Sequence, residues 1–312
     1  MSADGARWEV RRAGAHGLLV QCSHLDDVLA LHADLAADPL PGQLEALAAA
    51  RTVLLRFVSA SDARRAVPAL ESCGTEPAAP TEAKQVDIDV VYDGEDLGEV
   101  ARHTGLTVDA VIAAHTASAW AGAFGGFAPG FAYLTGGDPR LEVPRRTTPR
   151  TAVPAGAVGL AGEFSAVYPR RSPGGWQLIG RTAAAMWDLD RDPPALVRPG
   201  DRVRFRAVRE LVRVSDADGD TSSDVGGVSA PPAGPALLIE DPGPRALLQD
   251  RGRGGHGDLG VSPAGAADRT SAAEAQELLG TDPGAALVEI PLGGLRARAR
   301  GDLVLALTGA PL

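Results

Sequence analysis

The sequence predicts a mainly β protein of the α+β class, with a small α/β domain first, a larger β domain next and a short β-rich region last. Three observations predict this order. The 312 residues include 38 glycines and 24 prolines, so turns are frequent and a long helical bundle is disfavoured. Apolar residues make up 45% of the chain, which is enough for a folded core. Between residues 84 and 210, short strand-like runs alternate with Pro and Gly, as in a barrel or sandwich.

Residues 1–83 are predicted to form the small α/β domain. Its expected elements are a hairpin of 8–10 and 18–21, a helix that opens at a weak Ser23/Asp26 capping box, a strand over 52–58 and a helix over 62–71. The core side of the first helix is expected to carry Leu25, Val28, Leu29 and Leu35. Two prolines within 76–81 then mark the end of the domain.

The second domain, residues 84–210, opens and closes with alternating strands. At its start, Val86, Ile88 and Val90 alternate with Asp87 and Asp89. Near its end, Val203 and Phe205 alternate with arginines. Pairing these strands would set the acidic row opposite the basic row, which is favourable across a sheet. We therefore predict that the two strands are neighbours and tie the ends of one β domain together.

Residues 211–235 are predicted to be a flexible linker, because Asp, Ser, Gly and Pro dominate them. A folded pattern resumes over 236–312, whose length predicts part of a domain. The elements expected there are strands over 236–240, 286–290 and 303–307, and a helix that Asp268 caps and Gly280 ends. A polar, glycine-rich loop, 249–256, precedes this helix.

Residue types exclude several classes of function. The 30 basic and 40 acidic residues give a net charge of −10, which disfavours a dedicated nucleic-acid binder. Lys84 is the only lysine, so a phosphate-binding P-loop is excluded and a lysine that carries biotin is hard to place. Cys22 and Cys73 are too far apart for a CxxC metal or redox site. No apolar run approaches the length of a membrane span, and the cytoplasm is the expected location.

Residues 97–116 imitate a DNA-binding helix-turn-helix, with a first helix that ends at Gly105 and a second that Thr107 caps. The second helix carries no Arg or Lys for bases or phosphates, so two short helices packed on the β domain are the favoured interpretation. His115 falls on the apolar stripe of that helix. It is either a packing histidine of the core or a proton carrier beside the aromatic loop that follows.

That loop, 124–134, combines three Phe and one Tyr with glycines that allow close approach of the backbone. Its candidate binding residues are Gly126, Phe127, Pro129, Gly130 and Phe131. The loop either lines a pocket with aromatic walls and exposed amides, or is a tight turn held by a small apolar cluster.

Arginines gather in the segment after the loop. Between Arg140 and Arg171 there are six arginines but only two acids, Glu142 and Glu163. This local surplus favours an anion held by guanidinium groups, and a solvated edge strand guarded by prolines is the alternative. The candidates for anion binding are Arg145, Arg146, Arg150 and Arg181. Trp176 lies in a turn before Arg181, and both residues either contact the ligand or pack.

Four motifs in order resemble one known family. They are GGFAPGFAYL (125–134), VPRRTTPRTAVPAG (143–156), SPGGWQLIGRT (172–182) and PGDRVRF (199–205). Over about 1–210 the chain resembles the family of the B-type subunit of 5-oxoprolinase, also called allophanate hydrolase subunit 1 or kinase-inhibitor-like protein. Residues 236–312 resemble the start of the C-type subunit, through Pro242-Gly243-Pro244 and LLQDRGRGGHGDLGVSPAGAAD (247–268).

The resemblance implies a fused B–C protein, with a cyclophilin-like β barrel after the α/β domain and a partial second cyclophilin-like β domain at the end. With a separate A-type subunit, such proteins convert 5-oxoproline, ATP and water to glutamate, ADP and phosphate. The resemblance therefore implies ATP as a substrate, magnesium with it, and two partners, the A-type protein and the rest of a C-type domain. It also leaves two alternatives. One is the carboxyltransferase domain of a urea carboxylase, with biotin on a separate carrier, and the other is an inhibitor of a sensor histidine kinase.

Under the favoured hypothesis, an ATP-dependent amide hydrolase without a P-loop must meet phosphate charge with arginines and main-chain amides. The four candidate arginines would bind the anion, and the aromatic loop and Trp176 would shape the site. His115 or Glu163 would carry the proton.

Overall fold

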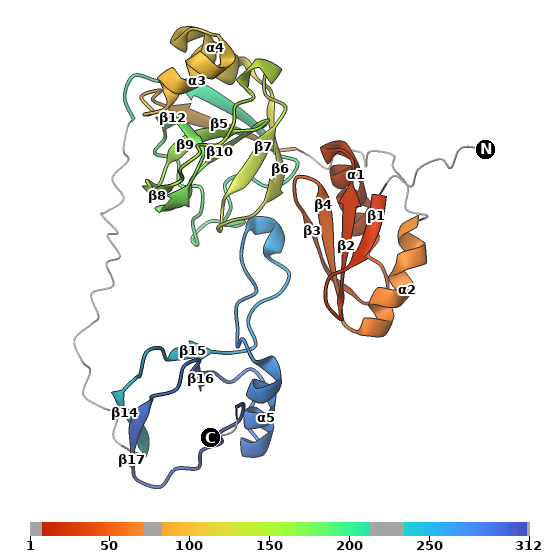
Figure 1. Cartoon of the computed structure of the whole chain (residues 1–312), viewed down its shortest axis with the longest axis vertical. Coiled ribbons are helices and arrows are strands. Elements are labelled where there is room, and N and C mark those ends of the chain that lie inside the picture. The colour runs from red at the N-terminus through yellow and green to blue at the C-terminus, as the bar shows by residue number, and fades with distance from the viewer. Residues whose placement is uncertain (1–7, 72–82, 212–233, 311–312) are drawn as a thin grey trace. The chain divides into compact units, whose positions relative to one another are not determined.

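The computed structural model describes residues 8–71, 83–211 and 234–310. Within these ranges the chain forms two compact units (Figure 1). The first comprises 8–71, 83–211 and the short segment 254–262, and the second comprises the rest of 234–310. The predicted linker falls almost wholly outside the described residues. Across the described ranges, no helix has both the length and the apolar character that crossing a membrane requires.

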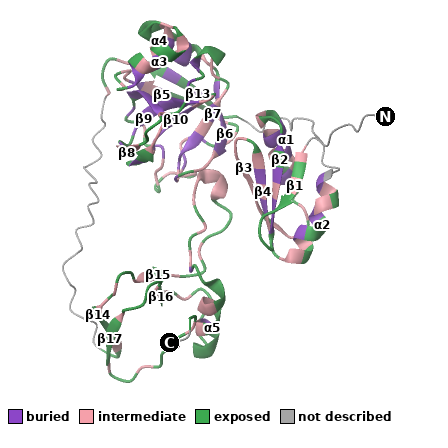
Figure 2. Cartoon of the chain, in the orientation of Figure 1, coloured by how far each residue is buried: buried purple, intermediate pink, exposed green. Residues whose placement is uncertain are grey.

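An antiparallel sheet covered by two helices opens the first unit. Its elements are β1 (Trp8–Arg12), β2 (Gly17–Cys22), α1 (Leu25–Ala37), β3 (Gln43–Ala48), β4 (Thr52–Phe57) and α2 (Ala60–Glu71). The strand order is β1-β2-β4-β3. Every second residue of β4, from Val53 to Phe57, is buried, and Leu31 of α1 and Leu70 of α2 join the same core (Figure 2). This alternation lets one face of the sheet bury its side chains under the helices.

Three details of this domain differ from the predictions. The Ser23/Asp26 capping box is wrong, because α1 begins after His24, which makes no capping bond through its side chain. Leu31 rather than Leu29 lies in the core, one turn from Val28 and Leu35. Strand β3 is not predicted by its residues, which are good helix formers. It forms because β4 offers an unpaired edge, and strand pairing overrides the local preference.

The next domain is a nearly closed, barrel-like sheet, as the resemblance implies. Its strands are β5 (Gln85–Val90), β6 (Trp120–Gly125), β7 (Ala132–Thr135), β9 (Ala157–Ala161), β10 (Phe164–Val167), β12 (Gln177–Arg181) and β13 (Arg202–Ala207). They form a 7-stranded sheet in the order β12-β9-β10-β7-β6-β13-β5. Val91 and Arg181 exchange two main-chain hydrogen bonds of 2.9 Å across the remaining gap. A separate ribbon pairs β8 (Arg150–Val153) with β11 (Ser172–Gly174).

The predicted pairing of the first and last strands of this domain is confirmed. β5 and β13 are parallel neighbours, with Asp87 opposite Arg204 and Asp89 opposite Arg206. The Nε atoms of the two arginines donate to these carboxylates at 3.0 and 2.7 Å. Exposed pairs of this kind add little stability each, but their order fixes the register of two strands that are far apart in sequence.

Two short helices close the barrel core, so the structural interpretation of 97–116 is confirmed. They are α3 (Leu97–Thr104) and α4 (Val108–Ala117), with the turn η1 (Pro139–Leu141) against them. Val100 and Val111 are fully buried in the core that the barrel strands fill. Gly105 ends α3 with a φ of 69°, and Thr107 caps α4 by accepting a 3.2 Å bond from the amide of Ala110, both as predicted.

The second unit contains two ribbons and a helix. Its elements are β14 (Ala236–Asp241), β15 (Leu247–Gln249), α5 (Arg269–Leu279), β16 (Leu287–Glu289) and β17 (Arg296–Arg300). Asp268 caps α5 by accepting a 3.0 Å bond from the amide of Ser271, and Gly280 ends it with a φ of 60°, as predicted. The strand predicted over 303–307 is wrong, because β17 pairs with β14 in its place.

Replacement of Phe205 with Ala is expected to lower the free energy of unfolding by about 3–5 kcal/mol. The ring is 1% exposed, and its centroid lies 4.4 Å from that of His115 and 6.4 Å from that of Trp120. Unfolding in denaturant measures the loss. Arg206→Ala, on the outer side of the same strand, is the matched control and should change little. Equal losses in the two variants would contradict the assignment of the barrel core.

Candidate functional site

A cluster of aromatic rings lies on the outer side of the barrel-like sheet. Along β9, Val158 and Leu160 belong to the barrel core, whereas Ala157 and Ala161 belong to a second apolar cluster, so this cluster occupies the other side of the sheet. We call its rings the aromatic face. They are Phe124, Phe127, Phe131, Tyr133, Phe164, Tyr168 and Trp176. Most neighbouring pairs meet edge to face, for example Phe131 and Trp176 with centroids 5.6 Å apart.

The turn 126–131 places one of these rings in solvent. Gly126 donates to the carbonyl of Phe131 at 3.1 Å, and Phe131 donates to the carbonyl of Ala128 at 2.9 Å. Phe127 has a φ of 66°, which is unfavourable for a bulky residue, and its side chain is 56% exposed. Strain and exposure of a large apolar ring together indicate a contact surface. Of the predicted loop residues, Phe127 is exposed, while Phe131 is 2% exposed and packs edge to face against it.

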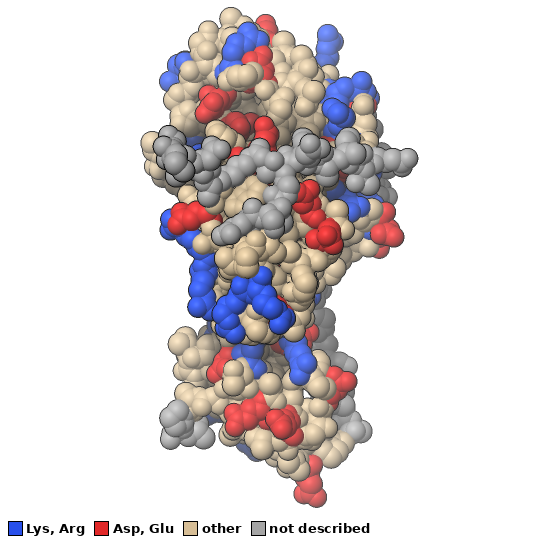
Figure 3. Space-filling view, turned by 90° about the vertical axis from the view of Figure 1, so that its right-hand side faces the viewer, with Lys and Arg blue, Asp and Glu red and all other residues tan. Residues whose placement is uncertain are grey.

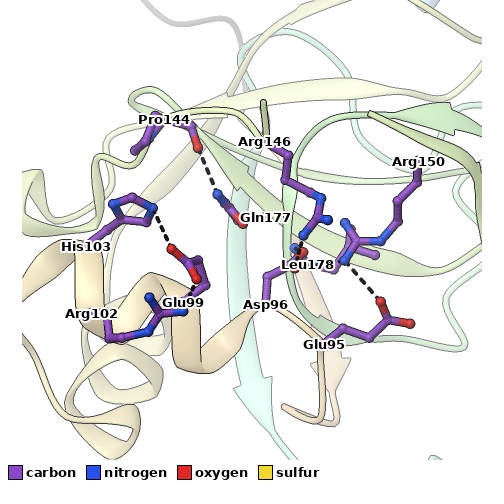
Figure 4. A network of polar contacts seen from close by, with 10 residues as sticks. All are labelled: Glu95, Asp96, Glu99, Arg102, His103, Pro144, Arg146, Arg150, Gln177 and Leu178. Atoms are coloured by element: carbon purple, nitrogen blue, oxygen red, sulfur yellow. Dashed lines mark hydrogen bonds and ion pairs between the residues drawn. The ribbon is translucent and has the colours of Figure 1, made fainter. Parts of the chain in front are cut away.

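Two predicted anion-binding arginines are brought together by a buried carboxylate. Nη1 of Arg146 donates to Oδ1 of Asp96 at 2.7 Å, and Nη2 of Arg150 donates to the same oxygen at 2.8 Å (Figure 4). The other oxygen of Asp96 accepts a 2.7 Å bond from the amide of Leu178. We call Asp96, Arg146 and Arg150 the arginine cluster. Asp96 stands at the start of α3, where an aspartate usually caps the helix, but its carboxylate is held by these three donors.

Arg150 also donates through Nη2 to Glu95 at 3.0 Å, so two carboxylates balance the two guanidinium groups of the arginine cluster. Burial raises the pKa of Asp96, but the bond from Arg150, the amide of Leu178 and the two positive charges outweigh it and hold the pKa below its ordinary value. Asp96 is therefore ionised near neutral pH. Nε of Arg146, Nη1 of Arg150 and Oε1 of Gln177 are buried without a hydrogen-bond partner among the described residues. Because these atoms are closed to solvent, they are unsatisfied polar groups within the packed protein, which costs stability.

Arg145 connects the arginine cluster to the aromatic face. Its side chain is exposed. Burial raises the pKa values of Tyr133 and Tyr168, and the positive charge of Arg145 offsets part of this rise. The amide of Arg146 donates to the carbonyl of Gly175 at 2.8 Å, directly before Trp176. Arg181 lies apart from this group, because its Nε donates to Asp93 at 2.9 Å on an exposed part of the surface.

His115 lies inside the barrel core. Its side chain is 0% exposed, with Nδ1 2.7 Å from the hydroxyl of Tyr92 and Nε2 2.9 Å from that of Ser165. Burial lowers its pKa to about 3, so the ring is neutral at physiological pH. The structure therefore supports the packing interpretation, since an enclosed neutral imidazole has no route to a ligand on the outer face.

Glu163, the other candidate proton carrier, is exposed at the turn between β9 and β10, directly before Phe164. It borders an open cleft of about 280 Å³. The residues that line this cleft are Ser23, His24, Leu25, Asp26, Ala50, Arg51, Thr135 and Glu163. The cleft is polar. Its N-terminal side is not predicted by the sequence, because Ser23 and Arg51 lie 112 or more positions before Glu163 and belong to no motif.

The described residues bring together no group of three or more His, Cys, Asp or Glu side chains that could hold a metal ion. Magnesium bound to ATP usually keeps the nucleotide phosphates and water as most of its ligands. Nothing in the site fits a resident metal, so the roles considered below belong to side chains and main-chain amides.

Asp96 and Tyr168 complete the site but were missed from the sequence. Asp96 follows Asp93 and Glu95 in a short acidic run, which looks like an ordinary solvated loop. Its role depends on partners 50 and 54 positions away. Tyr168 could have been suspected as one of the few aromatic residues of the chain, close to the arginine-rich segment.

Comparison with known families places most of the chain in one of them. The sequence model described as "Carboxyltransferase domain, subdomain C and D" matches residues 8–197, more than half of the chain. The model described as "Carboxyltransferase domain, subdomain A and B" matches residues 259–312.

Curated relatives agree with this match. The chain is 46% identical over 134 residues to the B-type subunit of 5-oxoprolinase from Escherichia coli O157:H7, covering 42% of this chain and 62% of that protein. It is 45% identical over 136 residues to the corresponding protein of Bacillus subtilis, covering 43% and 54%. The chain thus spans little more than half the length of these relatives. A shorter match, 41% identical over 66 residues, relates 20% of the chain to 4% of urea amidolyase from Saccharomyces cerevisiae.

Solved structures share the fold. The crystal structure of TTHA0988 superposes with a TM-score of 0.71 at 34% identity, covering 93% of this chain and 58% of that one. Urea amidolyase of K. lactis superposes with a TM-score of 0.55 at 20% identity, covering 66% and 15%, which supports the fold alone.

Replacement of Asp96 with Ala is expected to lower the free energy of unfolding by about 3–5 kcal/mol, because two partly buried guanidinium groups lose their common partner. Thermal or denaturant unfolding measures the change. Asp93→Ala, which removes the exposed partner of Arg181, is the control and should have a small effect. If both variants were equally stable, Asp96 would not be the anchor of the arginine cluster.

The stability of the protein should fall as pH decreases from 7 toward 3, in part because of His115. The unfolded histidine binds a proton near pH 6.5, whereas the buried ring does so only near a pKa of about 3, so acid favours the unfolded state. At pH 5 this contributes about 2 kcal/mol. His115→Gln should lose less stability than the wild type between pH 7.5 and 5. His16→Gln, at an exposed position, should keep the wild-type slope.

Proposed function

Because the chain belongs to the family of the carboxyltransferase domain, subdomain C and D, we propose that it is a component of an ATP-dependent 5-oxoprolinase. Its identity to curated B-type subunits of 5-oxoprolinase carries the proposal. The reaction converts 5-oxoproline, ATP and water to glutamate, ADP and phosphate. The proposed partners are a protein like the A-type subunit of such enzymes, and the rest of a C-type domain. ATP would arrive with magnesium.

The chemistry explains why such an enzyme needs ATP. A lactam carbonyl is a poor electrophile, so its oxygen first attacks the γ-phosphorus of ATP and ADP leaves. One water adds to the ring carbon, and the C–N bond breaks as the nitrogen takes up a proton. A second water displaces phosphate from the resulting acyl phosphate. The charge that develops on the phosphoryl group must be stabilised by fixed positive groups and amides.

The aromatic face and Arg145 suit this task. Phe127 offers one exposed ring to the lactam, and Arg145 offers an accessible cation for a carboxylate or phosphate. Both acidic and basic side chains lie on the surface shown in Figure 3, so exposed Arg145, not the net charge of −10, would attract the anion. Arg146 and Arg150 would hold the segment that carries Arg145, through their bonds to Asp96. Glu163 remains the proposed proton carrier, since it is exposed and His115 is not.

Carboxyl transfer to a urea-like amide is the second candidate. The names of both matching domains and the matches to urea amidolyases favour it. Both reactions act on a planar amide, so the same face would serve either. Since Lys84 is the only lysine, biotin would have to arrive on a separate carrier protein.

Phe127→Ala and Arg145→Ala are each expected to lower 5-oxoproline-dependent ADP release at least tenfold, measured with the A-type subunit present. Both side chains are exposed, so the free energy of unfolding should change little. Arg140→Ala removes an exposed arginine that pairs with Asp138, and it should keep full activity. Wild-type turnover in both test variants would remove the aromatic face from the mechanism. Urea-dependent turnover that avidin abolishes would favour the second candidate.

A further inference from the structure

Residues 254–262, here called the strap, fold with the first unit although they follow the predicted linker in sequence. The strap is the blue turn beside the barrel-like domain in Figure 1. Its centre is the short turn η2 (Gly257–Leu259), closed by bonds from the amides of Gly260 to Gly257 (2.9 Å) and of Val261 to His256 (3.1 Å). These internal bonds give the strap a defined shape that can dock as one piece.

The strap makes main-chain contacts on two sides. The amide of Gly257 donates to Oε1 of Glu45 on β3 at 3.0 Å. The carbonyl of Leu259 accepts a 3.1 Å bond from the amide of Gly130, in the turn of the aromatic face. The strap therefore joins the edge of the N-terminal sheet to the turn that presents Phe127.

Glycines on both sides of the contact allow the backbones to approach closely. A Cβ on Gly125 would lie 2.0 Å from the carbonyl oxygen of Asp258, and a Cβ on Gly260 would lie 2.2 Å from that of Ala128. Both distances are far inside van der Waals contact with backbone atoms, which cannot move aside cheaply. Gly260 also has a φ of 76°, which favours glycine. The sequence at these positions is thus fitted to a docked strap.

The contact bears on the strained part of the aromatic face. Phe127 keeps a positive φ only if its surroundings hold it there. Within the turn, the amide of Ala128 donates to the carbonyl of Gly126 at 2.7 Å across Phe127, and two further bonds join Gly126 to Phe131 and Phe131 to Ala128. The strap adds the bond to Gly130 and covers the carbonyl of Ala128. The residues on either side of Phe127 are therefore fixed partly by the strap.

We propose that the strap is a positioning element through which the C-terminal region holds the aromatic face in its binding shape. With the strap docked, Phe127 is presented to the ligand. With the strap released, the turn relaxes and the face loses its shape. The proposal rests on the proposed function only in taking the aromatic face as the binding site. The strap continues directly into the second unit in sequence. A structural change in the second unit can therefore alter the aromatic face through the strap.

The test compares two neighbouring glycines in the full chain. Gly125→Ala places a methyl group against the strap, whereas Gly126→Ala, the control, meets only the Tyr133 ring at an ordinary 3.7 Å. Site-resolved hydrogen exchange, without ligand, follows the amide of Gly130, which bonds the strap, and that of Phe131, which bonds only the turn. In Gly125→Ala both amides should exchange at least tenfold faster, and in Gly126→Ala both should stay within twofold of the wild type.

A second pair of variants tests the strap without changing a residue of the barrel. Gly260→Ala changes the strap itself, and Gly254→Ala is its control, because a Cβ there meets nothing within 4 Å. Gly260→Ala should reproduce the exchange of Gly125→Ala. Faster exchange at Gly130 with Phe131 still protected would overturn the proposal, since the strap would then dock without holding the turn. Unchanged exchange at both amides would overturn it as well, since the strap would then not be docked.

Activity separates this proposal from the proposed function. With the A-type subunit present, Gly260→Ala should raise the KM for 5-oxoproline about fivefold to tenfold and leave kcat within twofold, because it alters the binding surface and not a reacting group. If Phe131 exchanges faster but KM is unchanged, the strap does hold the turn, and the assignment of the aromatic face as the substrate site is what fails.

Discussion

The carboxylate of Asp96 is the interaction on which the site depends. It binds Arg146, Arg150 and the amide of Leu178, and so ties the start of α3 to the arginine-rich segment and to β12. A buried carboxylate with two guanidinium partners is costly to break, because each lost partner leaves an uncompensated charge. Glu95 pairs with Arg150 as well, so both guanidinium groups are balanced by carboxylates. The interaction at Asp96 thus fixes the loop that carries Arg145.

The two sides of the barrel-like sheet have different tasks. The inner side buries His115 between Tyr92, Ser165 and Phe205, where it is neutral and serves packing. The outer side carries the aromatic face and keeps Phe127 exposed in a strained conformation. Because successive side chains of a strand point to opposite sides, one strand such as β9 can serve both without conflict. Side chains on the inner side can therefore stabilise the barrel, while those on the outer side can differ according to the ligand.

The strap follows the barrel-like domain in sequence and adds main-chain contacts to the turn that carries Phe127. Its glycines and those of the turn 126–131 belong to segments far apart in sequence, and each allows the other to approach. A face assembled in this way is complete only when the C-terminal region is in place. In this chain, the match to subdomains C and D is followed by a match to subdomains A and B, which begins within the strap.

The sequence by itself determined the features that depend on near neighbours. These include the alternating strands 86–90 and 202–207, the caps at Thr107 and Asp268, and the composition of the aromatic loop. Only the tertiary structure decided that helix-forming residues 43–48 make a strand, that His115 lies in the core and that Arg146 and Arg150 meet at Asp96. The physical reason is that side-chain periodicity and capping act within a few residues. Partner choice for an edge strand or a buried charge depends on which distant segments packing brings together.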